Sequence, residues 1–180
     1  MTTIPRSRST DRRFYGVFEG IVTQVGDDLQ EGMIKVNLPW LDSHTESEWS
    51  PIVQLFAGPG HGAFFIPEVG SLVLCAARHG DLRKLVILGG LYNGVDKPAV
   101  SHERRRHIQT PSGQMLGFLD FNKNTEGAVF LQDSAGDSVS LSSNGTVVVK
   151  AQGALILDAP AIVLRGPGYK RVVANNRNTI

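Results

Sequence analysis

The stretch VSLSSNGTVVVKAQGALILDAP, residues 139–160, decides the fold of the C-terminal part of this 180-residue chain. Its two glycines, Gly145 and Gly153, lie eight residues apart, and the apolar side chains around them recur at the same interval. Successive side chains of a β-strand point to opposite faces, so residues two apart share one face. The repeat therefore predicts one short strand in every eight residues, each followed by a turn.

Each repeat places a large, a second large and then a small side chain on the same face. These sets are Val139, Val147 and Leu155, then Leu141, Val149 and Leu157, then Ser143, Ala151 and Ala159. The pattern continues at Ile162, Leu164 and Gly166 after a seven-residue step.

A meander of this kind has nothing within one chain to cover its apolar face. Eight residues per strand are too few to turn a three-walled coil, and an exposed apolar stripe favours association. We therefore expect three copies to wrap around one axis as an intertwined trimeric β-helix, or β-prism. The expected trimer core consists of Val139, Leu141, Val147, Val149, Leu155, Leu157, Ile162 and Leu164.

The composition favours an all-β protein throughout. The chain has 20 glycines and 9 prolines, so few windows could hold a helix of three turns. A net charge of +1 provides no general attraction for nucleic acid or for an anionic membrane. The basic N-terminus lacks the apolar stretch of a secretion signal, so we expect synthesis in the cytoplasm. The single cysteine, Cys75, lies in an apolar run and is expected in the core.

The N-terminal half contains six short apolar runs separated by turn residues. They cover residues 17–25, 33–38, 49–55, 63–66, 71–77 and 84–88. In the first run Val17, Ile21 and Val25 share a face with polar residues, and the second is expected to bury Ile34, Val36 and Leu38. Strands of this number and spacing predict a small closed barrel, because closure removes exposed strand edges.

These patterns divide the chain into five parts. They are an N-terminal arm (1–13), a barrel (14–95), a polar linker (96–112), a β-helical spike (113–166) and a C-terminal tip segment (167–180).

Several motifs in the barrel resemble one known family. They are WSP at 49–51, GPGHGAFFIPEVG at 58–70, HGD at 79–81 and VILGGLYNG at 86–94. They are followed by IQTPSG at 108–113, FLD at 118–120 and LQD at 131–133. Together they resemble baseplate assembly protein V of contractile phages and the VgrG spike of type VI secretion. The barrel residues that carry the resemblance are Trp49, Pro51, Gly60, Gly62, Pro67, Glu68, Gly70, Gly80, Asp81, Gly89 and Tyr92.

The resemblance implies an OB-fold barrel on a homotrimeric needle at the central axis of a tail baseplate. It also implies a hub protein above the barrels, a place in the virion or injection particle, and only transient contact with the target outer membrane. The needle would pierce the target cell envelope when the sheath contracts.

Two departures from the family concern the needle. Some members carry a lysozyme domain between barrel and needle, whereas here only residues 96–112 separate them. Some members end in a His-x-His tip that binds iron. The histidines of this chain are His44, His61, His79, His102 and His107, and none lies in the repeat. We therefore expect no enzymatic activity, no cofactor and no metal site, and a separate PAAR-like tip protein at the C-terminal segment.

Three polar features of the sequence are candidates for catalytic or metal sites. Asp42, His44, Glu46 and Glu48 form a polar cluster that suits an exposed loop better than a metal site. Asp133 and Asp137 flank a glycine and suit the ends of a β-turn better than a glycosidase pair. His61 has no accompanying nucleophile motif that would indicate a hydrolase.

The main alternative function is single-stranded nucleic-acid binding by the OB fold, with the β tail serving to oligomerise it. The basic run Arg104–Arg106 is the best support for that alternative. A trimeric receptor-binding fibre or polysaccharide-degrading enzyme would need a larger acidic and aromatic groove than such short strands present.

Overall fold

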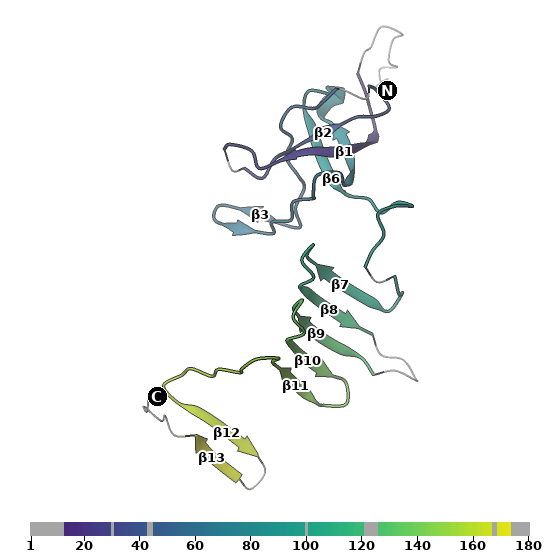
Figure 1. Ribbon diagram of the computed structural model, residues 1–180. Coiled ribbons are helices and arrows are strands. Elements are labelled where there is room, and N and C mark those ends of the chain that lie inside the picture. The colour runs from purple at the N-terminus through teal and green to yellow at the C-terminus, as the bar shows by residue number, and fades with distance from the viewer. Residues whose placement is uncertain are drawn as a thin grey trace, which may run out of the picture. The chain divides into compact units, whose positions relative to one another are not determined.

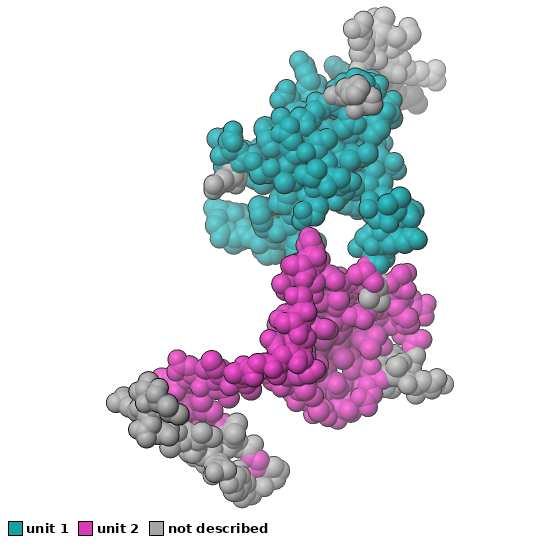
Figure 2. Space-filling model, in the orientation of Figure 1, with its two compact units in different colours: residues 1–98 teal, residues 99–180 magenta. Residues whose placement is uncertain are grey.

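The computed structural model describes residues 13–29, 31–42, 45–99, 101–120, 126–166 and 169–173. The chain divides into two compact units, Met1–Pro98 and Ala99–Ile180, which Figure 2 shows in different colours. The described residues form strands, turns and a single short 3-10 turn, Arg78–Gly80, and contain no α-helix. The expectation of an all-β protein is therefore confirmed.

The first unit is built on a four-stranded antiparallel sheet with the order β2-β1-β5-β6 (Figure 1). These strands are β1 (Val17–Val25), β2 (Ile34–Asn37), β5 (Leu72–Ala77) and β6 (Leu85–Gly90). The segment 50–52 closes the sheet, because Ser50 pairs antiparallel with Ile34 of β2 and Ile52 pairs parallel with Ile87 of β6. The two edges of the sheet are thus joined, which gives an OB-like barrel.

A single apolar core fills this barrel. Its buried members are Val22, Ile34, Val36, Leu38, Val73, Cys75, Leu85 and Ile87. The burial expected for β2 is confirmed, and so is the core position of Cys75, whose thiol pKa is raised by burial to about 11. On β1 the core face carries Phe18 and Val22, so the face that holds Val17 is the outer one.

Two of the six apolar runs do not form the strands expected of them. Residues 49–55 contribute only isolated bridges, and residues 63–66 lie in no strand. A side chain takes the place of a strand partner here, because the amide of Gln54 both accepts from the Phe65 N–H (3.1 Å) and donates to the Phe65 carbonyl (3.1 Å). A short hairpin, β3 (Ala57–Gly58) and β4 (His61–Gly62), lies between the two runs.

The second unit is a five-stranded antiparallel meander with the order β11-β10-β9-β8-β7 (Figure 1). Its strands are β7 (Arg105–Gln109), β8 (Met115–Leu119), β9 (Ala128–Gln132), β10 (Ser138–Ser142) and β11 (Val147–Lys150). A separate hairpin follows, made of β12 (Ile162–Gly166) and β13 (Tyr169–Val173). Strand β7 lies in the segment expected to be a linker, and β13 lies in the expected tip segment.

The eight-residue repeat forms strands at β10 and β11, but its next unit does not form a strand. The chain reverses between β10 and β11 at Gly145, which has a left-handed backbone (φ 84°) that glycine adopts without steric cost. Gly153, at the equivalent position, is not among the positive-φ glycines, and residues 154–159 follow without strand pairing. Within a single chain the repeat is thus an antiparallel meander that ends at Lys150.

No helix in the described part of the chain has the length and apolar character needed to cross a membrane.

The loop after β1 depends on one carboxylate, that of Asp27. This side chain is only 8% exposed and accepts hydrogen bonds from the backbone N–H groups of Glu31 (2.8 Å) and Met33 (3.0 Å). Burial alone would raise the pKa of Asp27, but these backbone donors outweigh it and hold the pKa below its usual value of 3.8.

We predict that Asp27→Asn lowers the melting temperature at neutral pH and has little effect in acid. A carboxylate with a depressed folded-state pKa stabilises the fold above its unfolded value of 3.8, and this contribution is lost as the pH falls through the folded-state pKa. Thermal unfolding of the wild type and the variant at pH 7 and at about pH 3 measures the change in melting temperature under each condition. The exposed neighbour Asp28 provides the control, since Asp28→Asn should change neither midpoint. An equal loss for Asp27→Asn at both pH values would contradict the prediction.

Candidate interaction face of the second sheet

One face of the β7–β11 sheet carries apolar side chains on all five strands, with Arg106 of β7 as the charged exception at one edge. Strand register places Leu116 opposite Ile108 on one side and Leu131 on the other, and Leu131 lies opposite Val139. A parallel row runs through the neighbouring pairs. The apolar face consists of Ile108, Leu116, Phe118, Val129, Leu131, Val139, Leu141, Val147 and Val149. It spans all five strands of the sheet.

Nothing in the described part of the second unit covers this apolar face. Leu131 is 56% exposed and Val149 is 52% exposed, although a core residue of the same kind would be nearly inaccessible. A hollow of about 390 Å³ opens on the face beside Leu131, Val139, Val149 and Leu155. A continuous apolar surface of this kind marks a site of association rather than an ordinary solvated surface.

The residues expected to form a trimer core lie in three places. Val139, Leu141, Val147 and Val149 lie together on the apolar face. Leu155 and Leu157 lie in the unpaired segment after β11 and are exposed. Ile162 begins the β12 hairpin, and the side chain of Leu164 is outside the described part of the structure. Their role in a trimer remains a prediction.

Five members of the apolar face were not anticipated from the eight-residue repeat. They are Ile108, Leu116, Phe118, Val129 and Leu131, which precede the repeat. Alternation of apolar and polar side chains does not identify them, because β8 and β9 carry apolar side chains on both faces, and only the strand register shows which of them share a face.

The opposite face of the same sheet covers itself. The guanidinium carbon of Arg105 lies 4.9 Å from the centre of the Phe130 ring, and its Nη2 is 3.0 Å from the sulfur of Met115. Gly117 lies directly beneath this ring, and a Cβ at that position would stand 2.3 Å from the ring carbon Cζ of Phe130. The glycine is therefore needed for the ring to lie flat on the sheet.

The basic run proposed for nucleic-acid binding is engaged within the chain. Arg104 pairs with Glu103 (3.8 Å), Arg106 pairs with Asp120, and Arg105 stacks on Phe130. A phosphate backbone would have to compete with these partners.

The polar cluster near β2 is likewise satisfied within the barrel. Glu46 accepts hydrogen bonds from Gln24 (3.0 Å) and Lys35 (3.4 Å), and the Lys35 ammonium lies 5.1 Å from the ring centre of Trp49. The expected cluster member His44 lies outside the described residues. Among the described residues, no group of three or more His, Cys, Asp or Glu side chains converges as metal ligands would.

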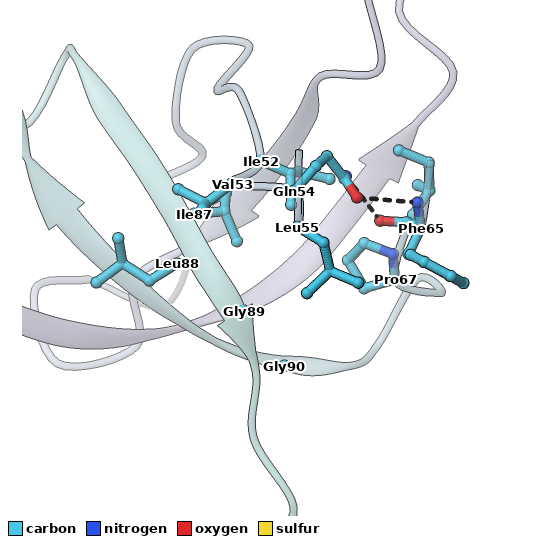
Figure 3. Close-up of a pocket in the computed structure, with 11 residues that line it drawn as sticks. Ile52, Val53, Gln54, Leu55, Phe65, Pro67, Ile87, Leu88, Gly89 and Gly90 are labelled. Atoms are coloured by element: carbon cyan, nitrogen blue, oxygen red, sulfur yellow. Dashed lines mark hydrogen bonds between the residues drawn. The ribbon is translucent and has the colours of Figure 1, made fainter. Parts of the chain in front are cut away.

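A second hollow, of about 400 Å³, lies at the end of β6 (Figure 3). Val53, Leu55, Phe65 and Leu88 contribute to its apolar lining, and Gln54 provides its polar side chain. Figure 3 shows the Gln54 amide engaged with the Phe65 backbone, so it holds the loop in place. The lining contains no nucleophile and no acid or base that could support catalysis.

The motif residues of the barrel occupy its closures and turns. Pro51 accepts a hydrogen bond from the Ile87 N–H (2.9 Å) at the closing segment. Ser71 N–H donates to the Glu68 carbonyl (3.0 Å) in the turn before β5, where Gly70 has a φ of 92°. The remaining motif residues are Gly60 and Gly62 in the β3–β4 hairpin, Gly80 in the 3-10 turn and Asp81 directly after it, the half-buried Trp49 beside Lys35, Pro67 in the loop before β5, Gly89 near the end of β6, and the exposed Tyr92 after β6.

The expected turn at Asp133 and Asp137 is confirmed. The Asp133 N–H donates to the Asp137 carbonyl (3.1 Å), and the Asp137 N–H donates to a carboxylate oxygen of Asp133 (2.8 Å). Both carboxylates are thus engaged, since that of Asp133 closes the turn between β9 and β10 and that of Asp137 accepts a hydrogen bond from the Gln152 N–H (2.6 Å).

The barrel can be assigned to a known class. Residues 18–92 match the family described as the type VI secretion system/phage-baseplate injector OB domain, and this range contains the closed barrel from β1 to the end of β6. The barrel is therefore similar to the injector OB domain, the family that its motifs resemble.

Part of the chain is also similar to a spike protein. The chain is 31% identical over 81 residues to the type VI secretion system spike protein VgrG1c of Pseudomonas aeruginosa. The match covers 41% of this chain and 11% of that protein, so the chain corresponds to about a tenth of the length of its relative.

We predict that Gly117→Ala destabilises the second unit by about 1–3 kcal/mol, because the added methyl group forces the Phe130 ring from its place. Chemical unfolding measures the loss. Gly117→Ala combined with Phe130→Leu should recover part of it. Gly153→Ala is the matched control, since no atom lies within 4 Å of a Cβ built there. Unchanged stability of Gly117→Ala would show that the ring can move aside without cost.

Proposed function

We propose that this chain is the structural central spike of a contractile tail or injection-system baseplate. In this proposal three copies join through their second units as an intertwined β-helix around a threefold axis. The observation that carries it is an apolar face, five strands wide, that no described residue of the same unit covers. The injector OB domain in the same chain supports the particular setting.

The physical argument for three copies begins with the geometry of a single layer. A stable protein interface buries about 800 Å² on each partner, and burial of apolar surface contributes about 25 cal/mol for each Å². The apolar face of a single-layered sheet can be buried to this extent only against another layer, which further copies of the chain would provide. Three copies related by a closed rotation each provide one wall of a prism, and their apolar faces meet at its centre.

The mechanical role follows from the same features. A spike that transmits the force of sheath contraction to a target envelope needs stiffness and slow unfolding rather than catalysis. The barrels would contact a hub protein above, and the C-terminal segment would receive a PAAR-like tip protein. The needle would be assembled in the host cytoplasm on the tail axis, and it would meet the target outer membrane only during penetration.

Single-stranded nucleic-acid binding by the OB fold is the alternative. Exposed Phe56 and Phe64 beside the β3–β4 hairpin could stack on bases. The three basic residues Arg104–Arg106 are paired or stacked, however, and the Lys35 ammonium is occupied by Glu46. Salt-dependent nanomolar binding of a labelled oligonucleotide would favour this alternative over a passive spike.

We predict a native mass of three copies by light scattering, and that Leu131→Asp reduces it to one copy. The aspartate is tolerated on an exposed position of a single chain but not at the centre of a trimer. Unfolding of the barrel should be unaffected. Ser140→Asp, on the opposite face of the same sheet, is the control and should keep three copies. A wild-type mass of one copy with a folded second unit would refute the proposed assembly.

A further inference from the structure

The segment that follows β11 is not paired with any described strand. Residues 154–159 run between Gly153 and Pro160, and no hydrogen bond joins their backbone to any other described residue. Their side chains are exposed, and Ile156 is 82% accessible. Large apolar side chains exposed along an unpaired stretch of backbone mark a site of association, so we treat this segment as a candidate for strand pairing.

The edge of the sheet nearest to this segment in sequence is also without a partner. Strand β11 pairs with β10 on one side and is the last strand of the sheet on the other. All four residues of β11 are exposed, including Val148 and Lys150. An open edge of this kind is a template for a further strand.

The chain cannot fill its own edge with this segment. Parallel pairing needs a crossover of a dozen or more residues, whereas only residues 151–153 lie between β11 and the segment. Antiparallel pairing needs a tight reversal, which the chain makes at Gly145 with a φ of 84° but not at Gly153. The partner of each must therefore come from another copy.

The eight-residue repeat supplies a register for that pairing. It matches Val147 with Leu155 and Val149 with Leu157, so the apolar face continues from one strand to the next. On the opposite face it matches Lys150 with Asp158, which carry opposite charges.

Only the parallel arrangement matches both apolar pairs and also brings these two charges together. Antiparallel pairing that sets Val147 beside Leu157 and Val149 beside Leu155 would place Lys150 beside Ala154, with no carboxylate opposite. Within the described structure neither Lys150 nor Asp158 has an ion-pair partner. Both charges are thus available to a neighbouring copy.

We infer that residues 154–158 of one copy pair in parallel with β11 of the next copy, and that Lys150 and Asp158 form an ion pair between copies that fixes the register. This inference rests on the proposed trimer and specifies where its strands are exchanged. In a closed threefold ring each copy gives one strand and receives one, so three such pairs form.

Charge reversal tests the pairing directly. Lys150→Glu and Asp158→Lys each place like charges together, and each should shorten the half-life of the trimer in detergent on the order of tenfold, since three cross-strand pairs change at once. The double variant Lys150→Glu/Asp158→Lys restores opposite charges and should recover the half-life to within about twofold. Lys97→Glu, an exposed reversal in the first unit, is the matched control and should have no effect.

Hydrogen exchange provides a second measurement. In the wild-type trimer the amides of residues 154–158 should be protected, although they have no partner among the described residues of their own chain. Rapid exchange of these amides in a protein of three-copy mass overturns the inference and leaves the proposed spike intact. Equal losses in the double and the single variants also overturn it. A native mass of one copy overturns both.

Discussion

A single-layered β-sheet has two faces, and a large apolar face needs a second layer to cover it. The second unit of this protein is such a sheet, and no described residue of that unit provides the second layer. One of its faces is partly covered by its own side chains, because Arg105 stacks on Phe130 and Phe130 lies on Gly117. Its apolar face has no such arrangement. Short strands, tight turns and a regular eight-residue interval are the features expected of a sheet whose apolar face packs against copies of itself.

The first unit covers its apolar side chains within one chain. Its sheet closes through a short segment at Ser50 and Ile52, so both edges are paired and the apolar side chains converge on one core. The chain therefore joins a unit that is complete alone to a unit that is not. This division of labour suits an assembly in which the barrel folds within one chain and the apolar face of the second unit is covered by other copies.

The sequence allowed several features to be predicted because their causes are local. Alternation identified the buried side chains of β2, an apolar setting identified Cys75, and the repeat placed Val139 and Val149 on one face. Other features were missed because their causes are not local. The partner of the Phe65 backbone is a side chain, Gln54, rather than a strand, and no pattern of hydrophobicity reveals such a substitution. Gly145 and Gly153 have equivalent positions in the repeat, yet only Gly145 has a left-handed backbone and reverses the chain. The conformation of each glycine depends on whether the following segment has a strand to pair with.

The closing segment of the barrel has a consequence for how this domain can vary. It contacts the two sheet edges over three residues, and the β3–β4 hairpin that follows lies outside the circuit of strands. The ends of that hairpin are held together by the amide of Gln54, so its tip can change in length or sequence without disturbing the core. In a domain built in this way, substitutions at the tip of the hairpin leave the buried side chains of the barrel in place, so the surface around the hairpin can change separately from the core.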